Sequence, residues 1–185
     1  KWGNKEDLKE EPIKYLLKLY VKFHEEAEKE DSLNQQARDE FKKLEDGNPQ
    51  SKELWDIFRE LSLKEFNRIY DILGMTFDSY DGEASINKQV QPAIEEIKEK
   101  VKTEMSDGAL IVDLEEYNMP PMLLLKSDGA TTYHSRDMAT AFKRLRKLRA
   151  QKLLYIVGSE QKLHFKQLFK VLEMMGYPKE NFIHA

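Results

Sequence analysis

Two stretches near the C-terminal end decide the fold: LLLKSDGATTYHSRDMATA, residues 123–141, and LLYIVGSEQKLHFKQLF, residues 153–169. Each begins with an apolar run typical of a strand and continues into a pattern typical of a helix. Each change of pattern carries a polar cluster, namely Tyr133, Arg136 and Asp137 in the first stretch and Gln161 and His164 in the second. Ligands of open α/β sheets bind at the carboxyl ends of strands. If both junctions open onto one crevice, they present a carboxylate, a phenol, an amide and an imidazole to one small molecule.

The final third of the chain alternates strands and helices. The pattern predicts strands at 122–126 and 153–157, another beginning at 181, and helices at 135–148 and 159–175. This order is typical of a parallel sheet with crossover helices.

The rest of the chain has a different character. Residues 1–74 are predicted to form a helical arm whose helices begin near Pro12, near Ser32 and after Pro49. A capping box of Ser62 and Glu65 could divide the last of them into two helices with a bend. Residues 75–122 are predicted to form a small α+β insert, with a strand at 75–80, a helix at 87–104 and a strand at 109–114.

Composition excludes several classes of protein. The 185 residues carry a net charge of −4, whereas domains that hold nucleic acid by charge alone are usually basic. The chain has no cysteine, which excludes disulfides and thiolate chemistry and fits a reducing compartment. No apolar run approaches the ~20 residues of a membrane span, so no membrane partner is expected. We find no motif of a metalloprotease, serine hydrolase or P-loop enzyme, and no metal site is expected.

The first polar cluster has two interpretations. Ser135 is a suitable N-cap, which would place Asp137 at the second helical position, where the helix dipole favours a carboxylate by ~0.3–1 kcal/mol. Alternatively, Asp137 and the phenol of Tyr133 suit a planar cation such as guanidinium, whose donors match a carboxylate bidentately.

The second polar cluster and a basic run after the first cluster also have two interpretations each. Gln161 and His164 are three residues apart and share a helix face, as surface residues or as parts of a site. The run from Lys143 to Lys152 could contact RNA phosphates, although the acidic chain favours a solvated helix face.

Taken in order, these motifs resemble the catalytic domain of arginyl-tRNA synthetases. The resemblance rests on K-S-D-G-x-T-x-Y-x-x-R-D followed by Y-I-V-G-S-E-Q-x-L-H-F-x-Q-L-F, and on F-D-S-Y-D-G-E upstream. It covers nearly the whole chain. It implies an α/β fold, a partial Rossmann-type parallel sheet with a helical arm and a small α+β insert. The sequence pattern predicts the divisions at 1–74, 75–122 and 123–185.

The resemblance also implies a function. Enzymes of this family couple L-arginine to ATP, with Mg²⁺ as the ATP counter-ion and no tightly bound cofactor, and then transfer arginine to tRNA(Arg) in the cytoplasm. Matching positions imply that Tyr133 and Asp137 hold the guanidinium, that Gln161 positions the amino acid and that His164 lies on the nucleotide side.

The family's HIGH-type and KMSK-type motifs are absent from these 185 residues. We therefore expect a central fragment of a longer enzyme that is inactive alone. The alternative is a non-catalytic helical module that binds a partner protein through residues 8–72. The oligomeric state is left open.

Overall fold

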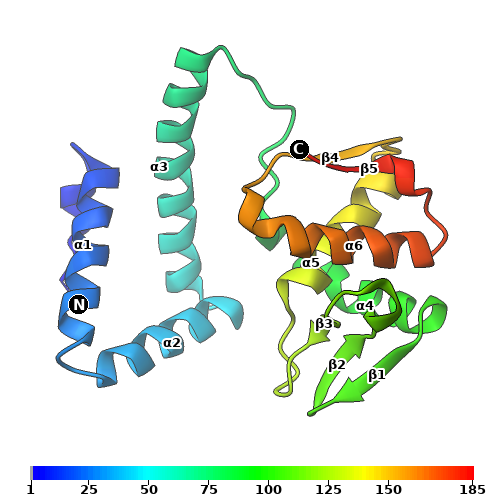
Figure 1. The fold of residues 1–185 in the computed structure, drawn as a ribbon. Coiled ribbons are helices and arrows are strands. Elements are labelled where there is room, and N and C mark those ends of the chain that lie inside the picture. Colours follow the sequence, from blue (N-terminus) through cyan, green and yellow to red (C-terminus); the bar gives the residue numbers. More distant parts are fainter. Residues whose placement is uncertain (1) are drawn as a thin grey trace. The chain divides into compact units, whose positions relative to one another are not determined.

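The computed structural model describes residues 2–185, apart from the side chains of Lys5, Glu45, Glu83 and Ala84. The chain divides into two compact units, Lys1–Asp78 and Ser79–Ala185. Each unit contains its own set of elements, which Figure 1 labels in chain order.

The first unit is helical. Its elements are a short 3-10 helix, Lys5–Leu8, and the helices α1 (Pro12–Ala27), α2 (Ser32–Glu45) and α3 (Pro49–Leu73). Within this unit, α1 and α3 extend from the same side of α2 (Figure 1). Asn48 caps α3 by accepting from the backbone N–H groups of Gln50 and Ser51, and Gly74 ends it in the left-handed conformation at φ 67°.

The helices of this unit bury little apolar surface. Among its described residues only Ala27 and Leu33 are buried, whereas Leu17, Tyr20 and Ile72 are among the exposed large side chains. The expected helical arm is therefore present, and its three helices are amphipathic without enclosing a large core of their own.

Two predictions in this region are wrong. The capping box at Ser62 does not divide α3, because the helix runs unbroken from Pro49 to Leu73. Residues 75–80 form no strand, since no neighbouring strand pairs with them. The ring of Phe77 instead packs at 4.6 Å from that of Tyr70 on α3.

The second unit contains helices and two small sheets. After a short 3-10 helix, Glu83–Ile86, come α4 (Asn87–Lys100), β1 (Thr103–Ser106), β2 (Ala109–Val112), β3 (Met122–Leu125), α5 (Tyr133–Phe142), β4 (Leu153–Tyr155), α6 (Lys162–Met174) and β5 (Phe182–His184). Short helical turns lie between them: Glu115–Tyr117, a π-helical turn Lys143–Lys147, Ser159–Gln161 and Lys179–Asn181. The second unit is thus α/β.

Strands β1, β2 and β3 form an antiparallel sheet in that order. The predicted helix at 87–104 extends too far, because α4 ends at Lys100 and residues 103–106 form β1, which was not predicted. Val101 adopts an extended conformation after α4, and Asp107 and Gly108, both at positive φ, turn β1 back onto β2. The Asp-Gly dipeptide, a strong hairpin signal, would have predicted this turn.

The parallel pairing is smaller than expected. Strand β4 pairs with β5 in parallel, and α6 is the crossover between them. Strand β3 belongs to the antiparallel sheet with β2, so its expected place in a parallel sheet with β4 and β5 is wrong. The predicted helix at 135–148 begins earlier, at Tyr133, and gives way to the π-helical turn after Phe142.

One apolar core holds the second unit together. It includes Ile94 and Ile97 of α4, Met122 of β3, Met138 of α5 and Leu168 of α6, all fully buried. Because α5 and α6 both contribute to this core and contact each other, their first turns have fixed positions. The predicted site residues lie in or next to these turns: Tyr133 and Asp137 in the first two turns of α5, Gln161 just before α6 and His164 in the first turn of α6.

Candidate functional site

The predicted site residues lie on α5 and at the beginning of α6. Tyr133 is the first residue of α5 and Asp137 lies one turn further along the same helix. Gln161 ends the short helical turn before α6, and His164 lies in the first turn of α6. Both pairs follow a strand, β3 or β4, as the sequence pattern predicted.

The cap of α5 differs from the prediction. Thr132, and not Ser135, is the N-cap: its Oγ1 accepts from the N–H of Ser135 at 3.3 Å, and the Oγ of Ser135 accepts from the N–H of Thr132 at 2.9 Å. Thr132 Oγ1 also donates to the carbonyl oxygen of Leu123 at 2.6 Å, which ties the start of α5 to β3.

With Thr132 as the N-cap, Asp137 lies further into α5 than predicted. Asp137 is beyond the first turn of α5, where the favourable effect of the helix dipole on a carboxylate has largely decayed. The capping interpretation therefore no longer accounts for a carboxylate at this position. Tyr133 and Asp137 are four residues apart in one helix and share a face of it.

The structure brings Asp137 and His164 together. Nε2 of His164 lies 2.7 Å from Oδ2 of Asp137, within hydrogen-bonding distance. The side chain of His164 is 19% exposed and that of Asp137 is 35% exposed, so the carboxylate is partly open to solvent. The two polar clusters of the sequence thus meet through one member of each.

Two residues to which the sequence analysis gave no role extend this contact. The His134 ring stacks on the His164 ring, with centroids 4.3 Å apart and planes 30° apart. Nε2 of His134 lies 3.1 Å from Oε1 of the buried Gln167. Gln167 lies three residues after His164 on α6, and this spacing is the signal that could have found it.

The environment of His134 disfavours its charged form. Burial lowers the pKa of His134 to about 4, and the neighbouring His164 adds to this effect. His134 is therefore neutral at pH 7, and its imidazole acts as a hydrogen-bonding group without a charge.

The other two predicted residues remain apart from this contact. Tyr133 is 69% exposed and Gln161 is exposed at the start of α6. In the described part of the chain, neither side chain is hydrogen-bonded to Asp137 or His164. Both side chains are thus accessible to solvent.

The side chain of Tyr155, at the end of β4, is a further polar group, and the sequence predicted no role for it. Its hydroxyl is buried without a hydrogen-bond partner, and burial raises its pKa. The ring packs 4.6 Å from Phe165 on α6. Tyr155 lies in an apolar run, and nothing in the sequence predicted that its hydroxyl would lack a hydrogen-bond partner.

Part of the basic run has partners inside the second unit. Nζ of Lys143 lies 2.6 Å from Asp81. The guanidinium of Arg146 donates to both carboxylate oxygens of Glu96 at 2.6 Å and to the hydroxyl of Tyr177. This guanidinium lowers the pKa of Glu96 to about 2. Lys143 and Arg146 are thus committed to contacts within the unit.

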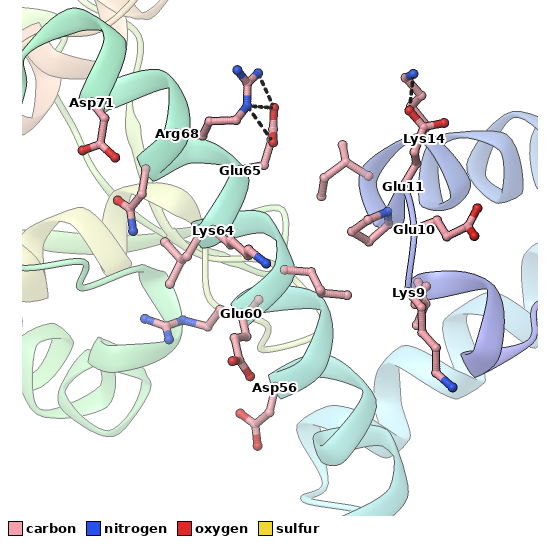
Figure 2. Close-up of a pocket in the computed structure, with 17 residues that line it drawn as sticks. Lys9, Glu10, Glu11, Lys14, Asp56, Glu60, Lys64, Glu65, Arg68 and Asp71 are labelled. Carbon is pink, nitrogen blue, oxygen red and sulfur yellow. Dashed lines mark hydrogen bonds and ion pairs between the residues drawn. The ribbon is translucent and has the colours of Figure 1, made fainter.

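A wide hollow of about 1390 Å³ lies in the first unit, between the start of α1 and the middle of α3 (Figure 2). Charged side chains of both signs dominate its lining, and none of the predicted site residues belongs to it. Its mixed charges, such as Glu65 paired with Arg68, give it no preference for one sign of ligand.

Among the side chains that the structure describes, no three of histidine, aspartate or glutamate are grouped so that they could hold a metal ion. None of the helices described is long and apolar enough to cross a membrane.

The family follows from the comparisons with known proteins. The whole chain, residues 1–185, matches the family described as "tRNA synthetases class I (R), catalytic domain". The chain therefore belongs to the catalytic-domain family of the class I tRNA synthetases.

Its relatives define the branch of that class. The arginine--tRNA ligase of Halothermothrix orenii is 51% identical over 177 residues, which are 96% of this chain and 31% of that protein. The arginine--tRNA ligase of Streptococcus suis is 53% identical over 176 residues, 95% of this chain and 31% of that protein. The chain thus spans about a third of the length of the curated relatives it matches, and the expected arginyl-tRNA synthetase resemblance is confirmed.

A solved structure agrees on the fold. The arginyl-tRNA synthetase of Plasmodium falciparum superposes with a TM-score of 0.78 at 24% identity, over 98% of this chain and 31% of that one. The alternative of a non-catalytic helical interaction module receives no support from these comparisons.

Proposed function

We propose that this chain is the arginine-recognising part of an arginyl-tRNA synthetase, which uses ATP to attach arginine to tRNA(Arg). One observation carries the proposal: the partly open carboxylate of Asp137 lies on α5, on the same helix face as Tyr133 and next to His164 of α6. A charged guanidinium in a partly buried pocket needs such a partner.

The geometry and the family resemblance support a specific set of substrate contacts. Asp137 would accept two N–H bonds from the guanidinium of arginine, whose planar fork of donors matches a carboxylate. Tyr133 would add its phenol oxygen, and Gln161 would bind the amino-acid end of the substrate. His164, for which the resemblance implies the nucleotide side, is hydrogen-bonded to Asp137.

The reaction requires no covalent intermediate with the enzyme. The carboxylate of arginine attacks the α-phosphorus of ATP, which releases diphosphate and forms arginyl-adenylate. A hydroxyl of the terminal adenosine of tRNA then attacks the arginyl carbonyl and releases AMP. The residues of this chain would contribute by holding arginine in position for attack, and Mg²⁺ would accompany the ATP.

The ATP-handling groups would come from the remainder of the enzyme. The HIGH-type and KMSK-type motifs are absent from these residues. In this family the KMSK-type motif would stabilise the phosphate charge of the transition state, and such stabilisation contributes much of the catalytic rate. The 185 residues alone would therefore be inactive.

We further propose that β4 and β5 are part of a larger Rossmann-type parallel sheet. Leu154 on β4 and Ile156 just after it are 58% and 83% exposed, and parallel sheets are normally covered on both faces. The divisions at residues 74 and 122 remain a proposal about domains, as does a cytoplasmic location.

Aminoacylation by the full-length enzyme that contains this chain tests the proposal. We expect arginine, and not lysine, to be attached to tRNA(Arg), with AMP and diphosphate as products. A well-folded full-length enzyme without arginine-specific attachment would overturn the proposal. In titrations of the 185-residue chain we expect little or no binding of arginine or ATP, and nanomolar ATP binding would contradict the assignment of the ATP site to other segments.

A further inference from the structure

We propose that His164 is a positioning residue that orients the carboxylate of Asp137 for the guanidinium of the substrate, and that His134 and Gln167 hold His164 in place. This inference rests on the proposed function, because it needs Asp137 to be the arginine ligand. It assigns to His164 an action on the arginine side of the site.

Gln167 is the buried residue that orients His134, and only 4% of its surface is exposed. Its Nε2 donates to the carbonyl oxygens of Pro120 at 2.8 Å and Pro121 at 3.3 Å. These two bonds fix the orientation of the amide, so Oε1 of Gln167 must be the atom that faces His134.

The amide in turn fixes the tautomer of His134. Because Oε1 can only accept, Nε2 of His134 carries the proton that it donates across 3.1 Å. His134 is neutral at pH 7, as its burial requires. The ring therefore has one orientation, which the core-packed helices α5 and α6 maintain.

The oriented His134 ring limits the movement of His164. The two rings stack with centroids 4.3 Å apart, and a swing of His164 away from Asp137 would break this stack. The Nε2–H of His164 then remains directed at Oδ2 of Asp137. In the described part of the chain, Oδ1 of Asp137 has no hydrogen-bond partner and stays available.

The orientation of the carboxylate matters for this substrate in particular. A guanidinium binds a carboxylate best when the two planes coincide and two parallel bonds form, whereas an ammonium behaves as a point charge. A carboxylate that rotates freely keeps its charge, but its plane no longer coincides with that of the guanidinium. Loss of one positioning bond should weaken arginine binding by about tenfold.

Four variants of the full-length enzyme test the inference. His164→Leu removes the N–H while keeping most of the volume, and His164→Gln returns an N–H that can reach Asp137. His134→Phe keeps a stacking ring without the bond to Gln167. Lys166→Gln, at an exposed position of α6, is the matched control. For each, the KM for arginine, the KM for ATP, kcat and the melting temperature are measured.

We expect His164→Leu to raise the KM for arginine about tenfold while the KM for ATP changes less than twofold. His164→Gln should return the KM for arginine to within about threefold of the wild type, and His134→Phe should raise it about threefold. The control should leave all three constants unchanged. A merely structural role would not give this split between the two substrates or the rescue by glutamine.

An unchanged KM for arginine in folded His164→Leu, or an equal rise in both KM values, would overturn the inference. If His164→Leu does not fold, folded His134→Phe decides in the same way: a selective rise supports the inference and an unchanged KM overturns it. Failure of the proposed function would look different, since the wild-type enzyme itself would then not attach arginine.

Discussion

Asp137 on α5 and His164 on α6 are 27 residues apart in the sequence and are joined by a contact of 2.7 Å between Oδ2 and Nε2. The contact joins the second turn of α5 to the first turn of α6, and the two helices follow different strands, β3 and β4. It places an imidazole beside a carboxylate that is still 35% exposed, so the carboxylate can serve both His164 and a ligand.

Removing the charge of Asp137 tests its proposed role as the partner of the arginine guanidinium. In the full-length enzyme, Asp137→Asn keeps the shape and removes the charge, which should raise the KM for arginine by about 30-fold or more. Steady-state aminoacylation at varied arginine measures this change. Asp107→Asn, in the turn between β1 and β2, is the matched control and should have no effect. A KM within threefold of the wild type in folded Asp137→Asn would remove Asp137 from the site.

The buried His134 should make the second unit sensitive to mild acid. Its pKa is about 4 when folded and 6.5 ordinarily, so between these values the unfolded chain binds a proton that the folded chain does not. The free energy of unfolding is therefore unaffected by this group above pH ~6.5. It falls as the pH drops toward 4, by at most ~1.4 kcal/mol per pH unit.

Urea denaturation of the chain at pH 7.5, 6 and 5 measures this dependence. The methyl NMR signals of the buried Met122 and Met138 report on the second unit. His134→Phe removes the titrating ring, so its stability should fall less over this range. Equal pH dependence in the variant and the wild type would show that His134 titrates normally.

Arg146 should contribute more than an ordinary surface ion pair. It makes two bonds to Glu96, contacts Tyr177 and lies 4.4 Å from the centre of the Phe142 ring. Arg146→Leu should destabilise the second unit by about 1–2 kcal/mol, measured as the shift of the urea midpoint. Lys98→Met breaks the exposed pair of Lys98 with Glu95 and should cost less than ~0.5 kcal/mol. Equal effects would refute the special role of Arg146.

The same pair has a consequence at low pH. Arg146 lowers the pKa of Glu96 to about 2, against 4.5 ordinarily. The stability that this carboxylate contributes is present above pH ~4.5 and is lost as the pH falls toward 2. The difference in stability between the wild type and Arg146→Leu should therefore shrink over this range, and a constant difference would contradict the ion-pair explanation.

The cap of α5 should be important for the site because it fixes the beginning of the helix that carries Asp137. Thr132→Val keeps the shape and removes the hydroxyl that bonds to Ser135 and Leu123. The expected loss is about 1–2 kcal/mol by urea denaturation, whereas Thr132→Ser should lose less than ~0.5 kcal/mol. A loss in Thr132→Ser with little or no loss in Thr132→Val would indicate that the methyl group, and not the cap, stabilises this position.

The sequence predicted most of the elements and misplaced several of their ends. The three helices of the arm and the strand-to-helix changes at 125 and 157 follow from periodicity and from breakers such as Pro49 and Gly74, because these are local properties. The predicted strand at 75–80 is wrong because a strand is not a local property. An alternating pattern is compatible with a strand, but the strand forms only where a partner strand is available for hydrogen bonding. Strand β1 was missed because a helical pattern was carried past its end at Lys100.

The pairing of strands could not be determined locally either. The order of strands and helices predicted parallel pairing, which holds for β4 and β5. Strand β3 pairs with β2 instead, because hydrogen bonding between strands depends on which edges the packed helices leave open. Strand order is therefore a property of the assembled unit.

The sequence by itself determined the family, the arm of amphipathic helices and the identity of Tyr133, Asp137, Gln161 and His164 as site candidates. These rest on residue types and their spacing along the chain. Only the tertiary structure decided that Asp137 meets His164, that His134 and Gln167 support this contact, and that Thr132 caps α5. Those contacts join residues on separate elements, and their distances depend on how the core packs α5 against α6.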